Sequence, residues 1–219
     1  MNFSEIDWPE IGHATLDTLQ MLGLSVIFTF IVGLPLGIIL YLTSPGGMLQ
    51  SRAFYSLVSA IINILRSVPF VILMIAMIPL TRAIVGTSLG VEGAIPPLVV
   101  AAAPFFARLV ETAVREVDRG VIEAAQSMGA SYRQIVWKVL LPEALPGLLA
   151  GITITTVTLV SYTAMSGLVG GGGLGDLAIR YGYQRFETEV MIITVILLVV
   201  LVQILQMIGD RLVQRFSRR

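Results

Sequence analysis

The side chains that usually perform acid–base, nucleophilic or metal chemistry are scarce in this 219-residue chain. It contains one histidine, His13, and no cysteine, so a disulfide framework, a cysteine-based zinc site or a cysteine nucleophile is excluded. The glycine-rich run 170–175 is not followed by the Gly-Lys-Ser or Gly-Lys-Thr of a phosphate-binding loop. We expect these glycines to let the chain turn. The chain is therefore expected to be non-catalytic, with no cofactor or metal of its own.

Polar residues inside apolar sequence are better candidates, and they point to solute passage. Arg66 lies in Asn63-Ile-Leu-Arg-Ser-Val-Pro69, within an otherwise apolar stretch, and a charge at the centre of a bilayer costs about 2.5–3.5 kcal/mol. One interpretation is that Arg66 faces a permeation path, with Asn63 as a second candidate. The other is that a membrane span begins near Ser67, so that Arg66 reaches the cytoplasmic surface.

A second set of path candidates lies in Ser161-Tyr-Thr-Ala-Met-Ser-Gly167. Met165 offers a polarizable thioether, Tyr162 an aromatic ring with a polar tip, and Ser166 a small hydroxyl. Gly167 and the glycines after it would permit movement there. The alternative is that these three side chains only pack against neighbouring helices.

The elements that must position these residues are membrane helices. Hydrophobic residues make up 56% of the chain, charged residues only 13%, and mean hydropathy is +0.88. A soluble domain carries roughly 25% charged residues. The zero net charge excludes a strongly cationic nucleic-acid binder. We expect an all-α membrane protein of about five spans, within Leu19–Leu42, Phe54–Leu80, Val91–Leu109, Ala144–Gly175 and Val190–Gly209.

The distribution of basic residues predicts the orientation of these spans. Residues 1–18 contain four acidic residues and no Arg or Lys, whereas the loop between the third and fourth spans and the C-terminal tail are rich in basic residues. We therefore expect an external N-terminal segment (1–14), a membrane domain (15–209) with a cytoplasmic loop at about 111–143, and a basic cytoplasmic tail (210–219).

The cytoplasmic loop has the charge spacing of a helix. Glu111–Arg115 and Arg119–Glu123 are four residues apart, and each such pair adds only about 0.2–0.5 kcal/mol. We expect the third helix to continue into solvent and to break at Gly120. A short amphipathic helix should follow, with an apolar side formed by Val121, Ala124, Ala125 and Met128, and should end at Gly129. Two helical turns are unstable alone, so this element must pack on its own chain or insert into a partner.

The same loop resembles the hallmark loop of ABC-importer permeases. That family's pattern is Glu-Ala-Ala, three residues, Gly, nine residues, Ile, one residue, Leu-Pro. The chain matches every position except the Ile, which is Val139; the others are Glu123, Ala124, Ala125, Gly129, Leu141 and Pro142. Over about residues 15–209 the chain is also similar to the permeases of methionine-uptake importers, in segments such as Ala103-Pro-Phe-Phe-Ala-Arg108 and Leu140-Leu-Pro-Glu-Ala-Leu-Pro-Gly147.

The resemblance implies a mechanism and a set of partners. A coupling helix would dock on a cytoplasmic ATPase that binds ATP and Mg²⁺, through Glu123, Ala124, Ala125, Met128, Gly129, Ala130 and Pro142. The permease would form a homodimer in the bacterial cytoplasmic membrane, with two ATPase subunits and an external substrate-binding lipoprotein. It would move methionine, in the L or D form, by alternating access, and bind no nucleic acid.

Three other functions compete with this one. A self-contained oligomeric channel or secondary carrier would keep the spans but leave the loop pattern from Glu123 to Pro142 unexplained. An intramembrane enzyme would lack catalytic residues. An exporter is less favoured, because the loop pattern with a separate ATPase resembles importers.

Overall fold

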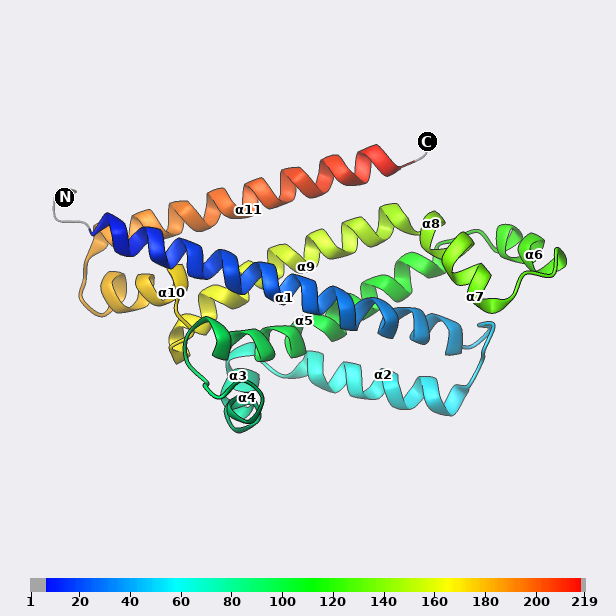
Figure 1. Ribbon diagram of the computed structural model, residues 1–219, viewed down its shortest axis with the longest axis horizontal. Coiled ribbons are helices and arrows are strands. Elements are labelled where there is room, and N and C mark those ends of the chain that lie inside the picture. Colours follow the sequence, from blue (N-terminus) through cyan, green and yellow to red (C-terminus); the bar gives the residue numbers. More distant parts are fainter. Residues whose placement is uncertain (1–6, 218–219) are drawn as a thin grey trace.

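The computed structural model describes residues 7–217, which form helices and no strands (Figure 1). Residues 1–6 of the predicted external segment and Arg218 and Arg219 of the predicted tail lie outside the described part. Within it, four helices are long and apolar enough to cross a membrane: α1 (Trp8–Thr43), α5 (Gly90–Arg115), α9 (Leu145–Ser166) and α11 (Thr188–Phe216). The expected all-α membrane fold is confirmed.

Shorter elements connect these helices. α2 (Arg52–Ser67), α3 (Phe70–Ala76) and α4 (Ile78–Val85) lie between α1 and α5, and α10 (Gly173–Leu177) lies between α9 and α11. The segment between α5 and α9 contains α6 (Arg119–Ser127), α7 (Tyr132–Ile135), the π-helix η2 (Val136–Leu140) and α8 (Leu141–Glu143). A 3-10 turn, η3 (Gly167–Val169), and a second π-helix, η4 (Ala178–Tyr183), flank α10.

The second predicted span is a bent pair of helices rather than one continuous helix. α2 and α3 meet at an angle of 103°, and only the bent pair together is long and apolar enough to count as a fifth span among residues 7–217. Pro69 supplies the reason, because it has no backbone N–H and disfavours helical backbone at the preceding Val68. A helix does begin just after Ser67, since α2 ends at that residue and α3 starts at Phe70 with Pro69 at its N-cap, but the seven residues of α3 are too few to cross a membrane alone.

Close packing of α1 against α5 forms the centre of the fold. Gly33 and Gly37 are buried on α1 and face Phe106, Ala107 and Val110 of α5. An added Cβ at Gly37 would lie 2.5 Å from both the Ala107 carbonyl oxygen and Val110 Cβ. Small residues at such contacts let membrane helices approach closely. The glycines in the first apolar run are therefore packing residues.

A methyl group at Gly37 should loosen this contact. We expect Gly37→Ala to lower the free energy of unfolding by about 1–3 kcal/mol, because α1 and α5 must separate to admit the added atom. Gly23→Ala is the matched control, since Gly23 lies on the same helix and a Cβ added there would have nothing within 4 Å. The midpoint of thermal unfolding of the detergent-purified chain measures both effects; equal midpoints for the two variants would contradict the packing role.

The break after α5 comes earlier than predicted. α5 ends at Arg115 and α6 begins at Arg119, so the chain turns at 116–118 rather than at Gly120. Asp118 explains the position, since its side chain accepts a hydrogen bond from the backbone N–H of Gly120 and so caps α6. Gly120 lies in the first turn of α6.

The two ends of the bundle carry different segments. α6, α7 and the C-terminal end of α11 lie at one end, whereas the start of α1 and α10 lie at the other (Figure 1). The two segments that are rich in basic residues, which the sequence places in the cytoplasm, thus share one end of the molecule. The glycine-rich run is at the opposite end, where positive φ angles at Gly170, Gly172 and Gly173 turn the chain out of α9, as expected.

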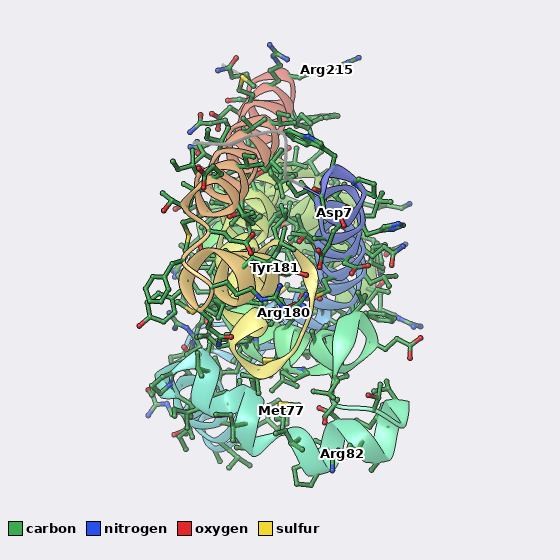
Figure 2. The ribbon with its side chains drawn as sticks, turned by 90° about the vertical axis from the view of Figure 1, so that its left-hand side faces the viewer. Asp7, Met77, Arg82, Arg180, Tyr181 and Arg215 are labelled. Atoms are coloured by element: carbon green, nitrogen blue, oxygen red, sulfur yellow. The ribbon has the colours of Figure 1, made fainter. Side chains whose placement is uncertain are left out.

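Figure 2 looks onto the end that holds the start of α1. Asp7, Arg180 and Tyr181 are grouped there, and Met77 and Arg82 lie on the neighbouring α3–α4 arm. Arg180 donates to Asp176 at 2.6 Å and lies 3.7 Å from Glu10. The hydrogen bond to Asp176 raises the pKa of the Arg180 guanidinium above its ordinary value. This local network ties η4 to the start of α1.

Candidate functional site

The inner side of α6 is anchored to the end of the bundle. Ile122 and Ala125 are buried in one apolar cluster with Val117, Ile135 and Leu140. Ala125 was expected to share one apolar side of the helix with Val121, Ala124 and Met128; the structure buries Ala125 and leaves the other three exposed. The helix therefore needs no partner for its inner face.

The outer side of α6 is a second apolar surface, and no described residue covers it. Val121, Ala124 and Met128 are all exposed, with Met128 at 82% of its full exposure. Their spacing of three and four residues places them on one side of the helix. We call these three residues the outer face of α6. An exposed apolar strip on a short, anchored helix at one end of the molecule is suited to docking on another protein.

The C-terminal end of α6 is held by a Schellman turn. The N–H of Ala130 donates to the carbonyl of Ala125 at 3.1 Å, and the N–H of Gly129 donates to that of Gln126 at 2.9 Å. Gly129 has φ of +79°, a left-handed conformation that suits glycine. The expected helix end at Gly129 is confirmed, and its role in the chain is to form the turn.

Replacing Gly129 tests this turn. We expect Gly129→Ala to destabilise the end of α6 by about 1–2 kcal/mol, because a Cβ is unfavourable in the left-handed region. Gly129→Asn is the control at the same position, since Asn adopts this conformation more readily. Hydrogen exchange of the α6 amides should rise in the Ala variant and much less in the Asn variant. Equal exchange in the two would mean that the turn does not limit helix stability.

The remaining residues of the predicted coupling set are accessible or border the same cluster. Glu123 and Pro142 are exposed, and Ala130 is partly buried against the apolar cluster. Tyr132 and Trp137, which were not among the predicted residues, are 50% and 70% exposed in the same segment. Large aromatic residues exposed in a charged loop are a recognisable sign of a contact surface, because Trp and Tyr are common in binding hot spots.

A buried polar network lies just before the break, between α2 and α5. Glu111 is only 4% exposed and accepts hydrogen bonds from Arg108 at 2.7 Å, Arg115 at 2.6 Å and the Tyr55 hydroxyl at 3.0 Å. Arg108 also donates to Ser59. The expected Glu111–Arg115 pair is confirmed, but the carboxylate is buried rather than solvated, and it joins α5 to α2.

Three of the five predicted path residues do not share one site in the structure. Asn63 accepts a hydrogen bond from Arg108 at 3.2 Å and so belongs to the α2–α5 network. Ser166 is fully buried and donates to the carbonyl of Thr163 at 2.7 Å. Met165 is 45% exposed and lies outside the cavity described next.

The structure brings the other two path candidates together. Arg66, at the end of α2, and Tyr162, on α9, line one cavity of about 120 Å³ with Phe70 and Phe105. Tyr162 stacks on Phe70, with ring centroids 4.6 Å apart and an angle of 4° between the planes. The Arg66 guanidinium lies 5.8 Å from the centroid of the Phe105 ring. The two phenylalanines were not predicted from the sequence, because only the bend at Pro69 and the packing of α5 bring them to this cavity.

Comparisons with known proteins agree with this arrangement. Residues 33–219 match the family model described as "Binding-protein-dependent transport system inner membrane component". The chain is 54% identical over 206 residues to "Probable D-methionine transport system permease protein MetI" of Vibrio cholerae, covering 94% of this chain and 92% of that one. It is 46% identical over 217 residues to "Methionine import system permease protein MetP" of Bacillus subtilis, covering 99% and 98%.

A solved structure gives the same picture in three dimensions. The chain superposes on one chain of "Inward facing conformations of the MetNI methionine ABC transporter: CY5 SeMet soak crystal form" with a TM-score of 0.96 and 50% sequence identity. The match covers the whole of both chains. The helical arrangement, including the bent α2–α3 pair and the short helices after α5, is thus similar to that of the transporter chain.

Proposed function

This chain belongs to the family of binding-protein-dependent transport system inner membrane components, and we propose that it is the permease subunit of an ATP-driven methionine importer. The names of the relatives from Vibrio cholerae and Bacillus subtilis support methionine, in the D or L form, as the substrate. The chain would act in the bacterial cytoplasmic membrane and would not itself hydrolyse ATP.

The observation that carries this proposal is the outer face of α6. Val121, Ala124 and Met128 form an apolar strip that no described residue covers, at the end of the molecule that also holds the C-terminal end of α11 (Figure 1). A permease that takes energy from a separate ATPase needs a small, rigid contact there. Anchoring of α6 through Ile122 and Ala125 supplies the rigidity. We infer that α6 docks on the ATPase, with Glu123 and the Gly129–Ala130 turn at its rim and Pro142 further along the loop.

The buried network connects that contact with the membrane helices. α6 follows α5 after a turn of three residues, and α5 is joined to α2 through Glu111, Arg108 and Tyr55. When two ATPase subunits close on ATP and Mg²⁺, movement of α6 would pass through α5 to α2, which carries Arg66. The path would then open to the outside, where a substrate-binding protein delivers its ligand.

A second copy of the chain is part of the proposal. α11 contains an 18-residue stretch with mean hydropathy of 2.8, of which only 6% is buried within the chain. Such a surface must face lipid or another membrane helix. One bundle of this size offers only a small cavity at Arg66, so we infer that the path lies between two copies, each with its own ATPase.

Reconstitution with partners tests the function. Purified permease should bind an ATPase at about one copy per chain, and proteoliposomes that also contain the binding protein should take up labelled methionine only when ATP is supplied. Uptake by the permease alone, driven by an ion gradient, would support a secondary carrier instead. Absence of any ATPase from the complex purified from native membranes would contradict the proposal.

A further inference from the structure

Arg66 is a cation within the bent α2–α3 pair, which together is long and apolar enough to cross a membrane. α2 begins at Arg52, directly after the turn that follows α1, and Arg66 occupies its last turn. At 1.5 Å per residue, the two arginines are about 21 Å apart along the helix, which is a large part of a hydrocarbon core of about 30 Å. With residues 7–217 considered, Arg66 forms no ion pair. Arg66 is exposed within this chain, and a charge held in a membrane is costly and marks a functional site.

The surroundings of Arg66 are aromatic. Its guanidinium lies over Phe105 of α5, while the stacked rings of Phe70 and Tyr162 form another wall of the same cavity. The cavity lining contains no acidic residue. α2, α3, α5 and α9 each contribute to it, so the cavity lies where the bent α2–α3 pair meets two long helices. One guanidinium group and three aromatic rings therefore line the same small cavity.

We propose that Arg66 binds the carboxylate of the transported amino acid, while Phe70, Phe105 and Tyr162 contact its side chain. A guanidinium presents its donors in a planar fork that matches a carboxylate, and a thioether makes favourable contacts with aromatic rings. Without an acidic residue in the lining, the α-ammonium group gains no ion pair here. The carboxylate is therefore the group on which this subsite selects.

The size of the cavity defines the extent of the site. Complete sites for small molecules enclose about 300–1,000 Å³, whereas this cavity measures about 120 Å³. It holds one end of the ligand, and the rest of the ligand faces the path. The inference rests on the proposed importer function, and it adds the residue that receives the charged group of the substrate.

The first test compares arginine variants in the complete complex of permease, ATPase and binding protein. We expect Arg66→Gln to lower ATP-driven uptake of labelled methionine, per assembled complex, at least about tenfold, through loss of a charge-assisted contact. Arg66→Lys should retain more uptake than Arg66→Gln, because it keeps the charge. Arg82→Gln is the matched control, since Arg82 lies on α4, donates to Ser88 at 3.0 Å and is outside the cavity.

Uptake by the Arg82→Gln complex should equal that of the unmodified complex. Unchanged uptake in Arg66→Gln would overturn the inference, as would an equal loss in the Arg82 and Arg66 variants. A fall in both Arg66 variants to the same level, with Arg66→Lys no better than Arg66→Gln, would also count against recognition by charge.

The second test locates the ligand directly. The complete complex is supplied with photo-methionine, a diazirine analogue that retains the carboxylate, and is irradiated during ATP-driven uptake. Crosslinks should map to peptides that contain Phe70, Phe105 or Tyr162, and their yield should fall at least about tenfold in Arg66→Gln. Crosslinks confined to other parts of the permease would overturn the inference but leave the transport function standing. Failure of the unmodified complex to take up methionine would instead contradict the proposed function.

Discussion

Replacing Ala124 with tryptophan is expected to reduce ATP-driven uptake at least about a hundredfold while the permease still inserts into the membrane. Ala124 is exposed on the outer face of α6, between Val121 and Met128, so the larger side chain has room within its own chain. The tryptophan side chain would not fit in a close contact between this face and a docked ATPase. Losses of this size occur at the few hot-spot positions near the centre of a protein interface. Uptake into proteoliposomes and the amount of bound ATPase measure the effect.

Ala124→Ser is the control at the same position, because it is small and should leave both measurements close to those of the unmodified complex. Thermal unfolding of the isolated permease should be the same for the Trp and Ser variants. Gly129→Trp would be a less informative test of coupling. Its backbone φ of +79° means that any bulky residue there also strains the end of α6. Normal uptake by the Ala124→Trp complex would refute docking through this face.

Removing the Glu111 carboxylate should cause the largest loss of stability. We expect Glu111→Ala to lower the free energy of unfolding by about 2–4 kcal/mol, because the partly buried Arg108 is then left without its counter-charge. The Tyr55 hydroxyl also loses its acceptor. The midpoint of thermal unfolding of the detergent-purified chain should fall by several degrees. Uptake should fall as well, since α2 and α5 are no longer tied together.

Two variants separate the buried charge from other effects. Glu116→Ala is the matched control, because Glu116 is an exposed glutamate just after the end of α5, where a substitution costs little. The double variant Arg108→Met with Glu111→Leu should recover part of the lost stability, since an apolar pair replaces a buried ionic one at little net cost. Equal stability of the Glu111 and Glu116 variants would show that the network is not a stabilising element.

Much of the fold follows from patterns that are local in the chain. Long apolar segments, interrupted by few charges, predict the four long helices, and the Glu111–Arg115 spacing predicts an ion pair that the structure contains. The end of α6 at Gly129 is also predicted locally, because a helix that ends in this type of turn needs a residue with left-handed backbone conformation. Each of these features depends on residues that are close to one another along the chain.

The errors occur where a distant contact decides the outcome. Glu111 is spaced like a solvated surface charge, yet α2 covers it and makes it a buried acceptor. Ala125 and Ala124 are adjacent and alike, but only Ala125 packs on the end of the bundle. No periodicity distinguishes the two alanines, because the choice of buried side depends on how α6 folds back onto Ile135 and Leu140.

The membrane class, the approximate spans and the loop pattern from Glu123 to Pro142 can be read without coordinates, because hydrophobicity, charge and motif spacing are properties of the chain alone. Tertiary packing decides which of the predicted path residues meet. It keeps Asn63, Met165 and Ser166 out of the cavity and brings Arg66 to Tyr162. This outcome depends on the bend of 103° at Pro69 and on the close contact of α1 with α5, because together they place side chains from four helices around one cavity.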